Sequence, residues 1–162
     1  MPMTSRQCEI AAESYAACLL AQSGYDVLVQ YGANQPQYDL MAMKGGRILP
    51  VSVKGSQDGG WMLAVRYVKP GVGYHAAIDK WLAHQRVDLV YVFVQFLGVA
   101  LGDAPRVYLA RPPEIAALLK LHRAGQGHGS LQENSALHAP RGRYADRVPE
   151  DWTFSGSRID SI

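Results

Sequence analysis

Cysteine is scarce in this chain, and its two cysteines are badly spaced for a disulfide. Among 162 residues there are only Cys8 and Cys18, and both fall in one expected helix. That spacing along a helix separates the two Cα atoms by ~15 Å, whereas a disulfide needs them within ~7 Å. We therefore expect free, buried thiols and a reducing compartment.

Long apolar runs are also missing. No run approaches the ~18 residues that a membrane-spanning helix needs, and the longest, at 89–94, has the length of a strand. The first residues lack the basic-then-apolar layout of a signal peptide. We therefore expect a cytoplasmic protein without a membrane partner.

Neither sign of charge dominates. Lysine and arginine number 16 and acidic residues 14, which gives a net charge of +2. Such a balance permits a nucleic-acid partner without requiring one. The hydrophobic content of 48% suffices for a domain with its own core and argues against global disorder.

Several familiar catalytic motifs do not occur. The five histidines have no cysteine partners at the spacing of a zinc site. The glycine pairs at 71–73 and 125–127 lack the strand-to-helix context of a phosphate-binding loop. No Gly-x-Ser-x-Gly elbow and no Walker motif is found. A zinc centre, a P-loop and a serine-hydrolase site are therefore not expected.

What the sequence does contain is a polar hairpin. Gly45 and Gly46 supply the positive φ angles that a tight turn between two strands needs. In the second strand, Ser52 and Lys54 share one face because strand side chains alternate. The hairpin brings Asp39, near the start of the first strand, toward this pair. An acid, a second polar group and a lysine at one sheet edge are typical of metal-dependent phosphodiester hydrolysis.

Around this hairpin the pattern predicts alternating helices and strands. Thr4 and Gln7 form a capping box for a helix that runs to Ser23, with Gly24 just beyond its end. This helix carries Glu13 among small residues. The further expected elements are strands at 26–31, in the hairpin, at 61–65, at 88–96 and at 106–110, with helices at 76–85 and 112–123. Their order predicts an α/β fold in which helices flank a mixed sheet.

The composition changes after residue 123. Gly, Ser, Asn, His, Pro and Arg dominate 124–151, so we expect a long loop or a partly disordered arm there. Trp152 and Phe154 are expected to dock the tail on the core. The chain thus divides into an α/β domain at 1–123 and an irregular C-terminal arm at 124–162. Its basic residues favour a solubilising loop over a DNA-backbone clamp; they are Arg141, Arg143 and Arg147.

Together these residues resemble the PD-(D/E)xK nuclease superfamily. Glu13 lies on the first helix, Asp39 on the second strand, and Ser52-Val53-Lys54 fills the (D/E)xK position at the end of the third. The nearest variety is the archaeal Holliday-junction resolvase type, or the related small bacterial restriction-like proteins. The resemblance covers residues 4–110 and implies a restriction-endonuclease-like αβββαβ core.

The resemblance also implies a function, which is that of a Mg²⁺- or Mn²⁺-dependent DNA endonuclease. DNA would be the partner, and many resolvase-like members are homodimers. Metal would be held by Asp39, by Glu13 and by the carbonyl of Val53. Lys54 would act on the attacking water and on the phosphate charge. Ser52 and Gln57 are expected as secondary groups of the catalytic site.

Ser52 departs from the family pattern, because the tripeptide normally begins with an acid. A hydroxyl is a weak, neutral ligand, so Mg²⁺ would bind less tightly. Direct coordination by Glu13, an oxygen of Gln57 or Asp58, or a substrate phosphate would complete the site. The alternative is a catalytically decayed nuclease-fold protein that binds nucleic acid or a protein partner without cleavage. A third hypothesis is an α/β protein unrelated to nucleases.

Overall fold

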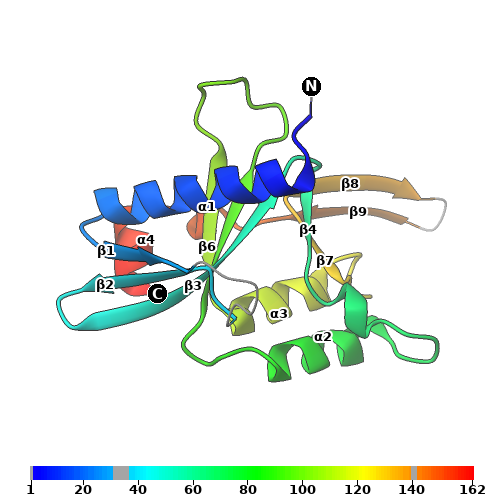
Figure 1. Cartoon of the computed structure of the whole chain (residues 1–162). Helices are drawn as coiled ribbons and strands as arrows, with labels where there is room; N and C mark the ends of the chain where they lie inside the picture. Colours follow the sequence, from blue (N-terminus) through cyan, green and yellow to red (C-terminus); the bar gives the residue numbers. More distant parts are fainter. Residues whose placement is uncertain (1, 31–36, 140–141) are drawn as a thin grey trace.

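The computed structural model describes residues 2–30, 37–139 and 142–162 and is built around a five-stranded sheet in the order β1-β2-β3-β5-β6 (Figure 1). Two smaller sheets pair β4 with β7 and β8 with β9. The strands are β1 (Asp26–Val29), β2 (Leu40–Lys44), β3 (Arg47–Ser56), β4 (Gly60–Met62), β5 (Val90–Gln95), β6 (Arg106–Ala110), β7 (Ser130–Gln132), β8 (Asn134–Ala139) and β9 (Gly142–Arg147). The helices are α1 (Ser5–Gln22), η1 (Val65–Tyr67), α2 (Tyr74–Ala83), α3 (Pro112–Leu121), η2 (Glu150–Trp152) and α4 (Gly156–Ser161).

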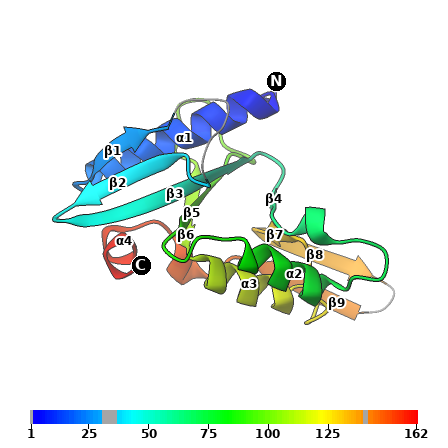
Figure 2. The ribbon, with the colours of Figure 1, turned by 60° about the horizontal axis from the view of Figure 1, so that its bottom comes forward.

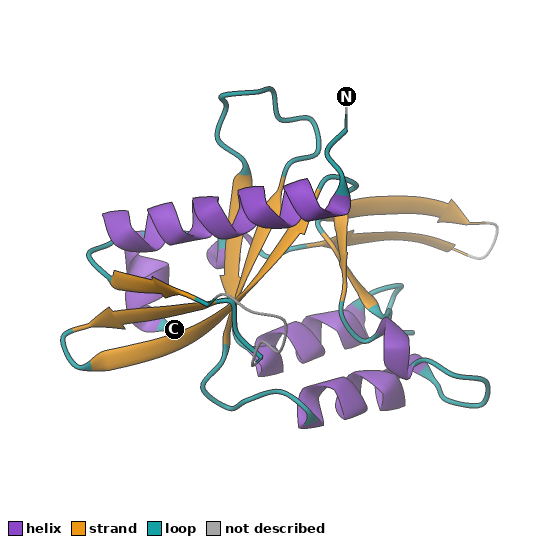
Figure 3. Ribbon diagram, viewed as in Figure 1, coloured by secondary structure: helices purple, strands orange, loops and turns teal. Residues whose placement is uncertain are grey.

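The central sheet mixes both strand directions. β1, β2 and β3 form an antiparallel meander, β5 runs parallel to β3, and β6 is antiparallel to β5. A parallel pair needs a long crossover, and here β4, η1 and α2 provide it. The predicted α/β class, with helices flanking a mixed sheet, is confirmed (Figure 3).

Helix α1 covers one face of the sheet. Its N-terminus has the predicted capping box between Thr4 and Gln7, and Gly24 follows its end with φ +84°. Small residues on α1 allow close packing on β3. A Cβ placed on Gly55 would lie 2.8 Å from the carbonyl oxygen of Cys8 and 2.9 Å from the Cβ of Ala12. Gly55 is therefore required where β3 passes under the helix.

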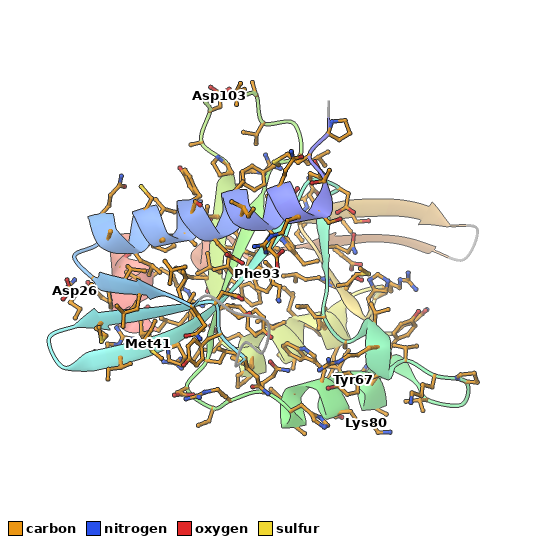
Figure 4. All side chains as sticks on the ribbon, viewed as in Figure 1. Asp26, Met41, Tyr67, Lys80, Phe93 and Asp103 are labelled. Carbon is orange, nitrogen blue, oxygen red and sulfur yellow. The ribbon has the colours of Figure 1, made fainter. Side chains whose placement is uncertain are left out.

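Helices α2 and α3 lie on the side of the sheet away from α1 (Figure 2). The core on this side contains Trp61, Trp81 and Phe93, together with aliphatic residues of α3. All six residues of β5 are buried, as the apolar run predicted for a strand covered on both faces. Figure 4 labels Phe93 at the centre of the molecule. None of the helices in the described part of the chain is long and apolar enough to cross a membrane.

The prediction of an irregular segment over 124–151 is wrong in its local structure. This stretch contains β7, β8, β9 and the start of η2. β7 pairs with β4, so a partner far away in sequence creates the strand. The predicted docking of the tail is confirmed, because Trp152 is buried and the main-chain N–H of Phe154 donates to the carbonyl of Val107. Arg141 lies outside the described residues.

The two cysteines are free, as predicted. Cys8 is buried against β3, but Cys18 is exposed. The expectation that both thiols are buried is therefore wrong for Cys18. The cause is its position on α1, since the buried stripe of that helix passes through Ala12, Ala16 and Leu20 instead.

Candidate functional site

Asp39 lies directly before β2, where its backbone is held on both sides. Its N–H donates to the carbonyl of Val51 at 2.8 Å, and its carbonyl accepts from the N–H of Gln30 at 2.9 Å. Its carboxylate oxygen Oδ2 accepts a hydrogen bond from the N–H of Val53 at 2.6 Å. The Asp39 side chain therefore accepts a hydrogen bond from the main chain of β3 that a carbonyl of a neighbouring strand would otherwise accept, at the point where β2 begins.

Ser52 occupies the position where the resemblance places an acid. Its side chain is buried, and its hydroxyl donates to Oδ2 of Asp39 at 3.3 Å. The single acid of the hairpin is thus held by a hydroxyl and a main-chain N–H. The carbonyl of Val53 leaves the same edge of the strand as its N–H, so it faces the Asp39 side of β3.

Lys54 lies two residues after Ser52 and is half-buried. Among the residues that the structure describes, its ammonium has no hydrogen-bond or ion-pair partner. Desolvating a charged group without a partner costs free energy. A lysine in this state is available to an anionic ligand.

Glu13 contributes from α1. Burial, followed by the negative charges of Asp39 and Glu9, raises the pKa of the Glu13 carboxyl. The positive charge of Lys54 acts in the opposite direction. The structure thus places the charges of Asp39 and Lys54 close enough to Glu13 to influence its pKa.

Gln57 is separated from this group by its own bonding. Its Nε2 donates to the carbonyl of Met3 at 2.5 Å, and its Oε1 accepts from the N–H of Met3 at 2.9 Å. Asp58 is likewise engaged, because its Oδ1 accepts from the hydroxyl of Ser56 and the N–H of Gly60. Neither side chain is placed beside Asp39.

The hairpin side chains open on a cavity of about 640 Å³, which we call the Asp39 cavity. Asp39, Ser52 and Lys54 line it together with residues from α1, η1, α2 and β5. Most of the further lining residues were not predictable from the sequence; they are Glu9, Gln37, Met62, Leu63, Val65, Arg66, Trp81, Gln85 and Tyr91.

Tyr91 also lines this cavity, and the parallel register pairs it with Ser52. Its hydroxyl donates to Oε1 of Gln85 at 2.7 Å. Burial, with a smaller contribution from Asp39, raises the pKa of Tyr91 to about 12. Tyr91 therefore stays protonated near neutral pH. Only the β3–β5 register would have revealed it, since it lies inside an apolar run.

The fold and the site are those of an α/β protein in which a carboxylate and a lysine line one open cavity, and this lysine has no hydrogen-bond or ion-pair partner within the described part of the chain. The chain matches no protein-family model and no curated protein sequence. Its function is therefore inferred from the Asp39, Lys54 and Glu13 side chains and from the cavity that Asp39 and Lys54 line.

Proposed function

We propose that the protein is a divalent-metal-dependent DNA endonuclease whose phosphodiester site consists of Asp39, Lys54 and Glu13. One observation carries this proposal. The Asp39 carboxylate is held on the N–H of Val53, one residue before an ammonium that has no partner among the described residues. Hydrolysis of a phosphodiester needs this combination, an acid to hold a cation and a fixed positive charge for the phosphate.

The strand order supports the proposal. A first helix, an antiparallel three-stranded meander, a crossover containing a helix and a strand parallel to β3 follow one another as in the expected αβββαβ order. Asp39 directly precedes β2 and Lys54 lies in β3, which supports assigning them as the first acid and the lysine of that order. This agreement favours the restriction-endonuclease-like core over an unrelated α/β fold.

The donor set fits a weakly held Mg²⁺ or Mn²⁺. Among the described residues, no group of three or more His, Cys, Asp or Glu side chains is gathered for a metal. Mg²⁺, however, usually keeps several waters and takes one or two carboxylates plus substrate phosphate. Asp39, Glu13 and the carbonyl of Val53 would hold it. Burial is the main cause of the raised pKa of Glu13, and a cation there would offset the smaller contribution from the negative charge of Asp39.

The residues of the chain have separate tasks in this reaction. The bonds from Val53 and Ser52 fix the Asp39 carboxylate, so little reorganisation is needed when a substrate binds. The ammonium of Lys54 offsets negative charge on the phosphate and orients the attacking water. Bound Mg²⁺ or Mn²⁺ would supply a more acidic water and further charge neutralisation.

Cleavage of DNA, supplied as a supercoiled plasmid and as a single strand, tests the proposal. Wild type is expected to cut at least one of these two substrates in Mg²⁺ or Mn²⁺ and to stop when the metal is chelated. Asp39→Asn is expected to lose cleavage, because the amide cannot neutralise a cation. Asp103→Asn is the matched control, since Asp103 lies in the loop between β5 and β6 at the edge of the molecule (Figure 4). Undiminished cleavage by Asp39→Asn would contradict the proposal.

A second candidate function is binding of nucleic acid or of a protein partner by a decayed site. It is favoured by Ser52, whose buried hydroxyl stands in place of the second acid and donates to the first. Ser52→Glu separates the two candidates. Cleavage by Ser52→Glu but not by wild type would identify a decayed site, whereas cleavage by wild type would exclude it. A DNA partner, a homodimer and a cytoplasmic location stay predictions.

A further inference from the structure

Two cavities meet at Lys54 and Met62. One is the Asp39 cavity, of about 640 Å³. The other, of about 490 Å³, is called the Asp58 cavity and is lined also by Cys8, Trp61 and Gln132. Lys54 and Met62 belong to both linings, so they form the boundary between the two hollows.

Met62 presents an apolar surface at this boundary. Its side chain is 78% exposed, although β4 is anchored by pairing of Met62 with Ser130 in β7. Trp61, its neighbour on β4, is buried and in contact with the ring of Phe93. The strand is thus fixed while Met62 projects outward. A flexible, polarisable thioether suits contact with flat, variable groups such as nucleobases.

The acids of the two cavities already have partners. Glu9 forms an ion pair with Arg6, Asp39 accepts from the N–H of Val53, and Asp58 accepts from the hydroxyl of Ser56. Hydrogen bonds and ion pairs of this kind reduce the repulsion that a carboxylate exerts on an incoming anion.

The cationic side chains that line the Asp39 cavity differ from these acids in their partners. Lys54 and Arg66 have no carboxylate partner among the described residues. The guanidinium of Arg66 lies 4.9 Å from the ring centroid of Tyr67 and donates to its hydroxyl. The positive charges along the Asp39 cavity therefore remain available to phosphate groups.

We infer that the substrate is a nucleic-acid strand that is unpaired at the point of cleavage, with the nucleotides on either side of the scissile phosphate in separate cavities. This inference rests on the proposed function, because it takes Lys54 as the position of that phosphate. Each cavity has a size typical of small-ligand sites.

Separate cavities require unstacked bases. Adjacent bases in a duplex are stacked and cannot enter two hollows divided by Lys54 and Met62. Proteins that act on such bases take them out of the stack, which costs least where the strand is already unpaired. Single strands are usually bound by a positively charged groove together with side chains that contact the faces of the bases.

Fluorescence anisotropy with a short labelled DNA strand and its duplex, both with the metal chelated, tests the inference. Wild type is expected to bind the single strand about tenfold more tightly than the duplex, and Met62→Asp to lose about tenfold in affinity for the single strand. Leu101→Asp is the matched control, because Leu101 is a fully exposed apolar residue in the loop between β5 and β6. Thermal melts of both variants verify that they are folded.

The outcomes separate the inference from the proposed function. Equal or tighter binding of the duplex, or unchanged binding by Met62→Asp, would overturn the unpaired-strand inference. Cleavage of duplex DNA that depends on Asp39 would also overturn it while leaving the endonuclease proposal intact. Preference for the single strand that depends on Met62, without cleavage in Mg²⁺ or Mn²⁺, would support the strand site and count against the proposed hydrolysis.

Discussion

The carboxylate of Asp39 accepts a hydrogen bond of 2.6 Å from the main-chain N–H of Val53. This bond joins the start of β2 to β3 one residue before Lys54. Because Val53 is buried in the core under α1, its N–H has no easy access to water. The Asp39 carboxylate therefore satisfies a buried main-chain N–H, in addition to its proposed role in holding a metal ion.

The structural task predicts a loss of stability in Asp39→Ala. Removing the carboxylate leaves a buried N–H unsatisfied, which costs about 1–3 kcal/mol. Asp39→Asn keeps an oxygen that can accept this bond and is expected to lose less. Urea denaturation of both variants measures the difference. Equal stability of Asp39→Ala and wild type would show that the N–H of Val53 finds another partner.

Ser52→Glu is expected to make stability depend on metal. A second carboxylate beside Asp39 introduces repulsion of like charges in a largely buried position. Mg²⁺ or Mn²⁺ would neutralise that pair and raise Tm by mass action. Thermal melts with metal and with chelator provide the measurement, and Ser52→Ala is the control without added charge. The same Tm for Ser52→Glu under both conditions would argue against a cation position here.

Gly55→Ala is expected to destabilise the protein by about 1–3 kcal/mol, the usual range for overpacking. The added methyl would meet the carbonyl of Cys8 and the side chain of Ala12, so α1 and β3 would have to separate. Gly156→Ala is the control, because a Cβ there meets nothing within 4 Å. Chemical denaturation compares the two variants, and similar losses in both would contradict the close approach.

The free energy of unfolding is expected to fall as the pH drops below about 6.5, the ordinary pKa of a histidine side chain. Burial is the main cause that lowers the pKa values of His122 and His128, and Arg123 lowers both further. The negative charge of Asp146 opposes this effect at His122. Since both folded-state pKa values are lowered, the unfolded chain binds protons first, and the folded state loses stability in acid.

Urea unfolding at several pH values measures this dependence. His122→Gln is expected to reduce the slope of unfolding free energy against pH between about 5 and 6.5. His84→Gln is the control, because His84 is exposed at the end of α2. If His122→Gln leaves this slope unchanged, groups other than His122 cause the pH dependence of stability.

Local signals in the sequence predicted much of the fold. The capping box of Thr4 and Gln7, the turn at Gly45 and Gly46 and the apolar run of β5 each specify their own element within a few residues. β7 could not be found this way. It has three residues and exists because β4, far away in the chain, pairs with it.

The candidate site likewise contains some residues that the sequence could predict and others that it could not. Asp39, Ser52 and Lys54 were predictable because one hairpin and the alternation of strand side chains bring them together. Tyr91 and Arg66 were not, since they reach the Asp39 cavity through the β3–β5 register and the path of the crossover. The bond from Met3 to Gln57 was equally hidden, because it depends on where the N-terminal segment lies.

The most direct test of the central claim is the single-turnover rate of DNA cleavage by Lys54→Ala in Mg²⁺ or Mn²⁺. Wild type is expected to cut, and Lys54→Ala is expected to be slower by about 100-fold or more, the usual cost of removing one group that stabilises transition-state charge. Lys69→Ala, which changes an exposed lysine after η1, is expected to cut like wild type. Cleavage by Lys54→Ala at the wild-type rate would contradict the assignment of this site as a nuclease centre.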